Sequence, residues 1–411
     1  MLGILGVSNS HSRFRTLMSA AASLLAFVIV STATAIFLPS PAHAQSSITT
    51  KISTPQAAPT PEPEPKKKKT FLRWKMSVGG ESFANDKEQA QTTGFGLVGD
   101  LRQILLPGLE LKVRAKMDLE SGYAQSQFGD NTPQSGVRLD EAYVQYKPFS
   151  TVVLQGGAIN QEHLNAPLLV NAQPFPGALE KITLGNHSYM VEAKAEQAIP
   201  TSTTLSTQAV SSEASPTFMT QTLTLQAKPF DKTLLLKAFG THYTFTGLPS
   251  SVALQSETYG NTIVEMGPNT SAFAYNFDGW LGGGEIKWQI TDHFAWRVDG
   301  YAFQNMKVAS SYGQAQDAST SFDIGLIHSI TLTPKAEVFF IDSDATPGFY
   351  NDSSYGHTNR EGWAADLSAK FDEAKFKVGL RYVDADVINA NLLQSRQQFM
   401  MLRFETYHDL F

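Results

Sequence analysis

The chain contains no cysteine, which excludes disulfides, thiol nucleophiles, zinc sites with cysteine ligands and a lipid anchor on cysteine. Long hydrophobic runs are also scarce, because the single one spans residues 17–38. A bundle of membrane-spanning helices needs several runs of about 20 apolar residues. The sequence therefore predicts neither a redox protein nor a helical membrane protein.

The hydrophobic run belongs to a pattern that is typical of a secretory signal. Arg13 and Arg15 precede it, and Ala42-His43-Ala44 follows it. We interpret residues 1–44 as a signal peptide that is cleaved after export. A retained membrane anchor is the alternative, since the run is long enough to span a bilayer.

A strong excess of positive charge is missing as well. Residues 1–44 hold two of the 32 Lys and Arg and none of the 38 Asp and Glu, which leaves a net charge of −8. This balance argues against a nucleic-acid partner. Residues 45–69 end in TPEPEPKKKK and are predicted to form an extended periplasmic linker. Its run from Lys66 to Lys69 could contact phosphate headgroups, although such a run is usually a solvated segment.

From Thr70 onward, apolar and polar side chains alternate with a period of two. In residues 109–120, Leu, Val, Ala and Met fall on one face, and Glu, Lys, Arg and Asp fall on the other. The pattern recurs in segments of roughly ten residues, the length with which a tilted strand crosses a bilayer. A soluble β-sandwich can alternate too, but repetition over residues 70–411 favours an all-β fold, a transmembrane antiparallel barrel.

The connections between these segments alternate between short and long, which predicts about 16 strands with short periplasmic turns and long extracellular loops. The weakest strands lie near residues 151–159, 201–210 and 233–245, so 14 or 18 strands remain open. Short turns are expected at residues 106–108, 147–150, 199–201, 229–232, 291–293, 331–334 and 371–374, and long loops at 80–91, 121–136, 160–187, 211–217, 246–275, 304–319, 343–360 and 384–396.

The charged face is expected to line a water-filled lumen. Pairing of the last strand with the first brings nine basic side chains into one sector: Arg73, Lys75, Arg102, Lys112, Arg114, Lys116, Lys377, Arg381 and Arg403. We expect them to face Glu162 and Glu180 across a constriction, where a transverse field favours dipolar solutes. The alternative is local pairing, as of Lys112 with Glu110 or Glu285 with Lys287.

Aromatic residues give two further expectations. All five tryptophans fall on the apolar face, where their rings would lie at the membrane interface: Trp74, Trp280, Trp288, Trp296 and Trp363. The end of the chain, with Tyr407 and Phe411, resembles the terminal strand that the outer-membrane assembly machinery recognises. Met400, Leu402 and Phe404 have the opposite parity, which predicts a bulge near Thr406.

The stretch RLDEAYVQYKP, Arg138 to Pro148, followed by a strand leading to Gly156, Gly157 and Ala158, resembles the porin family of Gram-negative outer-membrane β-barrels. The resemblance implies a diffusion channel for small polar solutes and ions, often a homotrimer, in contact with outer-membrane lipid and lipopolysaccharide. In general porins the third loop narrows the barrel, and residues 160–187 are the third loop here. Asn171 to Lys181 is similar to the Pro-Glu-Phe-Gly-Gly turn of that loop but lacks its acidic residue, and an ordinary outward loop is equally open.

No enzyme is predicted. The nine histidines are scattered, and the mature sequence has no H-E-x-x-H, G-x-S-x-G or phosphate loop, so no catalytic residue, cofactor or metal site is assigned. Asp342 with Asp344, and Asp384 with Asp386, could bind Ca²⁺ that bridges to lipopolysaccharide, but such pairs are more often solvated turn residues. A substrate-selective channel, an adhesin and an enzyme on a barrel scaffold remain alternatives to a passive porin.

Overall fold

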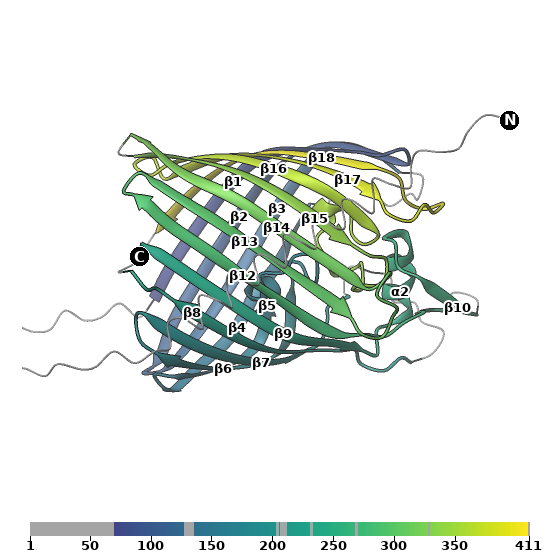
Figure 1. Cartoon of the computed structure of the whole chain (residues 1–411), viewed down its shortest axis with the longest axis horizontal. Helices are drawn as coiled ribbons and strands as arrows, with labels where there is room; N and C mark the ends of the chain where they lie inside the picture. Colours follow the sequence, from purple (N-terminus) through teal and green to yellow (C-terminus); the bar gives the residue numbers. More distant parts are fainter. Residues whose placement is uncertain are drawn as a thin grey trace, which may run out of the picture.

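The computed structural model describes residues 70–126, 135–202, 205, 212–230, 233–267, 270–327 and 329–409. The segments interpreted as signal and linker, and Phe411, lie outside these residues. Sixteen antiparallel strands close into a barrel in which β18 pairs with β1 (Figure 1). The barrel strands are β1 Thr70–Ala84, β2 Glu88–Leu106, β3 Leu109–Ser126, β4 Gly136–Phe149, β5 Val152–Asn160, β6 Pro174–Gly185, β7 Tyr189–Ala198, β8 Thr217–Ala227, β9 Leu234–Thr246, β12 Phe277–Thr291, β13 Phe294–Asn305, β14 Gln314–Ile327, β15 Ile330–Ile341, β16 Arg360–Phe371, β17 Phe376–Val387 and β18 Gln397–Asp409.

The alternation of the sequence explains the barrel. In β3, Lys112 and Arg114 line the lumen, while the intervening Val113 and its apolar neighbours face outward, because successive side chains leave a strand on opposite faces. Closure gives each described barrel strand a hydrogen-bonded neighbour on both sides, which removes the open edges that a flat sheet would have. The predicted fold class is confirmed.

The predicted count of 16 is also confirmed, but one strand was misassigned. Residues 174–185, predicted as part of the third loop, form β6, and the short turn that follows is at 186–188. The predicted turn at 199–201 belongs instead to the long connection between β7 and β8, and residues 201, 202 and 205 are not in a strand. β7 therefore runs in the direction opposite to the predicted one.

The first long loop was predicted wrongly as well. The connection between β1 and β2 is only residues 85–87, in which the Asn85 side chain accepts hydrogen bonds from the backbone N–H groups of Lys87 and Glu88. The strands here are longer than ten residues, with 19 in β2 and 18 in β3. The strict alternation of short and long connections therefore fails at this point.

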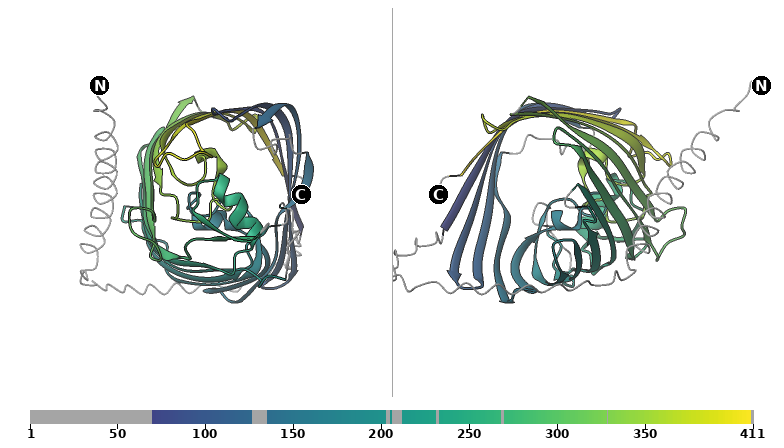
Figure 2. Two further views of the ribbon diagram at one scale, coloured as in Figure 1. Left: turned by 90° about the vertical axis from the view of Figure 1, so that its right-hand side faces the viewer. Right: turned by 60° about the vertical axis from the view of Figure 1, so that its left-hand side comes forward.

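Three segments from the long-loop end fold into the barrel. We call them the inward loops: residues 161–173, which begin with the 3-10 helix η1 Gln161–Leu164; the helix α2 Ser250–Thr258; and residues 342–359, which contain η2 Ser353–Tyr355. Figure 2 shows them inside the ring of strands. A hairpin, β10 Ile263–Gly267 with β11 Thr270–Phe273, projects beyond the barrel at the same end (Figure 1).

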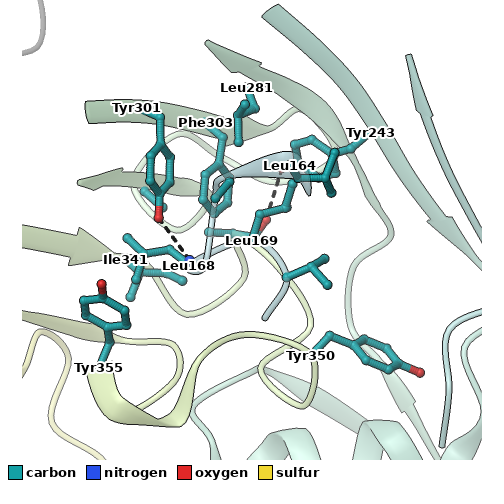
Figure 3. Packing of buried hydrophobic residues seen from close by; sticks show 14 of the residues in the cluster. Leu164, Leu168, Leu169, Tyr243, Leu281, Tyr301, Phe303, Ile341, Tyr350 and Tyr355 are labelled. Carbon is teal, nitrogen blue, oxygen red and sulfur yellow. Dashed lines mark hydrogen bonds between the residues drawn. The ribbon is translucent and has the colours of Figure 1, made fainter. Parts of the chain in front are cut away.

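The hydrophobic core lies inside the barrel. Leu168 and Leu169 are fully buried against inward aromatic side chains such as Tyr243 and Phe303 (Figure 3). The Leu168 backbone N–H donates to the Tyr301 hydroxyl over 3.0 Å. Within the described residues, no helix combines the length and apolar character that crossing a bilayer requires.

Candidate functional site: a charged sector of the lumen

The inward loops cover one side of the lumen, and a charged wall remains on the other. All nine basic residues predicted for the lumen lie on β1, β2, β3, β17 and β18 with their side chains on the inner face. These strands are neighbours because β18 pairs with both β1 and β17. We call this inner face, from β16 through β18 and β1 to β4, the charged sector.

Most charges in the sector pair along the wall. The Nζ atoms of Lys75, Lys112 and Lys116 lie 2.7, 2.7 and 3.1 Å from carboxylates of Glu405, Glu141 and Asp118. Arg102 pairs with Glu110, Arg403 with Glu405 at 3.1 Å, and Arg381 with Asp366 at 3.0 Å and Glu337 at 3.5 Å. Local pairing was the right alternative, although its partners differ: Lys112 pairs with Glu141, and Glu285 pairs with Arg297 at 2.9 Å.

Arg114 is held by a β-bulge. Its guanidinium lies 3.3 Å from Asp100, 3.7 Å from Asp140 and 3.9 Å from Glu141. The register between β3 and β4 shifts between Arg114 and Ala115, so that two successive acidic residues of β4 face the same arginine. The bulge lies in the stretch that resembles the porin family.

Glu81 and Lys377 are charges of the sector for which no ion pair is found within the described residues. The Glu81 carboxylate lines the hollow at the long-loop end, and Lys377 lines it nearer the short turns. Glu81 was not singled out from the sequence, because residues 80–91 were read as a loop outside the barrel. A lone charge beside water acts on passing ions more strongly than a neutralised pair.

Several cavities lie along the sector. A cavity of about 790 Å³ at the long-loop end is lined by Glu81 and Arg403 on the wall and by Tyr355 on the inward loops. It shares Glu81 and Arg403 with a cavity of about 120 Å³, and Arg381 and Arg403 with one of about 360 Å³. Arg73, Lys112 and Arg114 line a further 520 Å³ at the short-turn end.

The two predicted constriction carboxylates do not face the basic wall. Glu162 is exposed in η1, at the start of the inward loops. Glu180 lies in β6 between the inward side chains of Leu179 and Lys181, so it points out of the barrel. The predicted field between these carboxylates and the basic wall is therefore not formed, because Glu180 belongs to a strand rather than to a loop.

The third loop nevertheless enters the barrel. Residues 161–173 cross its interior, where the Asn171 N–H donates to the Tyr350 carbonyl and the Thr346 hydroxyl donates to the Leu169 carbonyl. Of the two alternatives for the third loop, folding into the barrel holds for residues 161–173. The stretch from Asn171 to Lys181, which is similar to the turn of the constriction loop, continues into β6. Residues 342–359 also lie in the interior, with Ala345 and Tyr350 fully buried, although they were predicted as a long polar loop.

Asp344 shows how the interior loops are held. It is 1% exposed rather than solvated, and its carboxylate accepts hydrogen bonds from the backbone and side chain of Thr262 and from Ser343. Burial raises the pKa of Asp344 despite these donors. Within the described residues, no cluster of three or more His, Asp or Glu is arranged to hold a metal ion.

The C-terminal strand differs from the prediction. Its register with β1 and β17 is continuous through residues 398–406, so no bulge lies near Thr406. Met400, Leu402 and Phe404 face outward, and Tyr407 shares the inner face of Arg403. Because these three apolar side chains already face outward, the strand needs no bulge to present an apolar outer face. Phe411 lies outside the described residues, and recognition by the assembly machinery stays a prediction.

The tryptophans occupy two levels on the outer face. Trp74, Trp288 and Trp296 lie near the ends of their strands that meet short turns, and Trp280 and Trp363 lie near the ends that meet long loops. Two such levels are what interfacial aromatic residues form. Their contact with headgroups stays a prediction.

No family model matches the sequence, and no curated protein matches it. The structure is similar to that of Pseudomonas putida OprB, with a TM-score of 0.52 and 13% identity over 82% of this chain and 94% of that one. Other similar structures are OmpT, an outer membrane protein of Vibrio cholerae (TM-score 0.45, 10% identity, 84% and 99% covered), and the outer membrane protein OprD of Pseudomonas aeruginosa (0.42, 11%, 83% and 94%). At this identity the OprB likeness shows the fold alone, and the chain is accordingly a closed, 16-stranded antiparallel β-barrel with the fold of the porins.

Proposed function

We propose that the barrel is a passive channel through which small hydrophilic solutes and ions diffuse along the charged sector. The observation that carries the proposal is the hollow beside that sector, which extends from Glu81 to Lys377 and is bordered by charged side chains. Charges along a narrow aqueous path keep it wetted and favour polar over apolar solutes. The residues of the sector do no covalent chemistry in this mechanism.

A substrate-selective channel is the second candidate. The inward loops favour it, because they fill one side of the lumen and confine solutes to the path beside Tyr355 and Asn171. A confined path discriminates by size and by polar contacts more sharply than an open barrel does.

Planar-bilayer recording tests both candidates. A passive channel gives ohmic conductance steps and a reversal potential in a salt gradient, and added small solutes do not block it in a saturable way. A selective channel shows saturable block by its own solute class. Absence of conductance steps from refolded, heat-modifiable barrel would overturn both.

A further inference from the structure

The charge on the lumen wall changes sign between the short turns and the long loops. The inner side chains of β3, followed from its short-turn end, include Lys112, Arg114 and Lys116 and then Asp118 and Glu120. All five face the lumen, because they occupy every second position of the strand. This strand therefore has a basic part and an acidic part along the axis of the barrel.

The two neighbouring strands have the same polarity. The inner face of β1 carries Arg73 toward the short-turn end and Glu81 near the long-loop end. β2 runs in the opposite direction along the chain, and its inner face carries Glu88 at the long-loop end and Arg102 at the short-turn end. Since the chain direction reverses and the polarity in space does not, the change of sign is a property of the wall rather than of one strand.

Pairing cancels the middle of this pattern but not its acidic end. Lys116 and Asp118, where the sign changes, lie 3.1 Å apart. At the long-loop end, Glu81 has no ion pair within the described residues, and the Glu88 carboxylate accepts a hydrogen bond of 3.0 Å from the Ser126 hydroxyl. A hydroxyl is a neutral donor, so the negative charge of Glu88 is retained.

The arginines that line the cavity at the long-loop end do not reverse its sign. Arg360 is 3% exposed and donates to two backbone carbonyls. Arg381 and Arg403 are paired with Asp366 and Glu405, at 3.0 and 3.1 Å. Ion pairs and buried charges act on ions in the water less than a lone charge does. The charge that faces the water at the long-loop end is therefore acidic.

The short-turn end is basic on both sides of the lumen. A cavity of about 340 Å³ away from the charged sector is lined by His187, Lys228 and Lys287 and, within the described residues, by no carboxylate. Lys228 has no ion pair in the part of the chain that the structure describes, and neither has Lys377 on the sector. In the cavity of about 520 Å³ on the sector, basic side chains outnumber carboxylates: Arg73, Arg102, Lys112, Arg114 and Lys147 stand against Asp100 and Glu110.

We propose that the lumen is a bipolar ion junction, acidic at the long-loop end and basic at the short-turn end, which conducts ions unequally in the two directions. The inference rests on the proposed channel and adds a direction to it. Fixed charge raises the concentration of counter-ions beside it, so cations collect at the acidic end and anions at the basic end.

The sign of the asymmetry follows from this arrangement. When the long-loop side is positive, cations and anions each enter through the end that concentrates them, and both accumulate in the middle of the lumen. The opposite voltage draws both kinds of ion out of the middle and depletes it. The current is therefore larger when the long-loop side is positive.

Salt controls the size of the effect. The screening length is about 3 Å in about 1 M salt and about 30 Å in about 0.01 M salt. In concentrated salt the wall charges act only on the nearest ions, and the conductance steps are ohmic. In dilute salt their fields extend across the lumen, and the current rectifies.

The test is single-channel recording at equal and opposite voltages in concentrated and in dilute KCl. Because the chain has no cysteine, Ala124→Cys places a single thiol on the cavity at the long-loop end. After each recording, a maleimide polyethylene glycol too large to cross the lumen is added to one side. It lowers the conductance only from the long-loop side and so identifies the orientation of the channel.

The expected result in dilute KCl is a current several-fold larger with the long-loop side positive, and in concentrated KCl a ratio near one. In the same background, Glu81→Lys/Glu120→Lys gives both ends the same sign, and the ratio in dilute KCl should fall to near one. Glu81→Asp/Glu120→Asp keeps the acidic charge and should restore the asymmetry. Heat-modifiable migration on gels shows that each variant is folded.

Equal currents in dilute KCl from the Ala124→Cys channel, or a larger current with the short-turn side positive, overturn the proposal. Rectification that persists in Glu81→Lys/Glu120→Lys also overturns it, because the acidic end would then not be its source. Absence of any conductance step overturns the proposed channel and this inference together, whereas symmetric steps in dilute salt overturn the inference alone.

Discussion

The two sides of the lumen are lined by the same alternating strands but by opposite kinds of side chain. In the charged sector the inner positions are acidic and basic, and they pair along the wall. Across the barrel, toward the long-loop end, the inner positions are aromatic or aliphatic and meet the inward loops, as Phe175, Tyr243 and Phe339 do. Alternation thus specifies the barrel, whereas the chemistry of the inner face decides whether the lumen is filled or left wet.

Removing the apolar contacts that hold the inward loops on the filled side of the lumen should have the largest effect on the channel. Leu168 and Leu169 are both 0% exposed, and truncation of each buried leucine to alanine costs about 2–5 kcal/mol. In the double variant Leu168→Ala/Leu169→Ala, the segment 161–173 should leave the inner wall and single-channel conductance should rise several-fold.

Leu392→Ala is the matched control, because Leu392 is 89% exposed and should leave conductance unchanged. Conductance equal to that of the parent in a clearly destabilised double variant would show that the filled side does not limit the path.

Neutralising the unpaired charges should have the next largest effect. Glu81→Gln removes from the hollow a carboxylate that has no ion pair within the described residues, so the reversal potential in a salt gradient should shift toward anion selectivity. Lys377→Gln removes an ammonium group that has no ion pair with any described residue and should shift the reversal potential toward cation selectivity.

Glu265→Gln, in the exposed hairpin, is the control and should leave the reversal potential where it is. Shifts of the same sign for Glu81→Gln and Lys377→Gln would mean that neither charge acts on ions in the path.

The same contrast explains how much could be predicted from the sequence. Where the inner face is charged, as in β3, period two is visible and both the strand and its lumen residues were identified. In β6 the inner Phe175 and Leu179 face the core while Ala178 and Ile182 face outward, so both faces are apolar and alternation disappears. Because alternation is absent and Pro174 and Pro176 are present, the sequence of β6 was predicted to be part of a loop.

The interior core could not be predicted for a related reason. Apolar residues in loops, such as Leu168 and Tyr350, have no periodicity that distinguishes burial in a lumen from chance. Their partners lie up to 177 residues away, as with the hydrogen bond between Thr346 and Leu169. Only the closed barrel brings them together.

Acidification should have the smallest effect on the channel, and it should act on the side of the lumen that the inward loops fill. His357 stacks on Tyr259 with ring centroids 3.7 Å apart, and its Nδ1 atom lies 2.8 Å from the Gly348 carbonyl and 2.9 Å from the Asn351 side chain. Burial, with Arg360 nearby, lowers the pKa of His357 to about 4, against about 6.5 in an unpacked loop. The packed loop is therefore fully favoured above pH of about 6.5 and loses stability as pH falls toward 4, by about 3 kcal/mol in all.

The expected signature is a rise in open-channel current fluctuations between pH 7 and pH of about 4.5, because a protonated His357 leaves its site and frees residues 342–359. His357→Gln keeps hydrogen-bonding groups but does not titrate, so its fluctuations should change much less with pH. His187→Gln, an exposed histidine in the short turn at the other end of the barrel, should behave as the parent does. If His357→Gln retains the full pH response, another group is the acid-sensitive one, and protonation of His357 does not release residues 342–359.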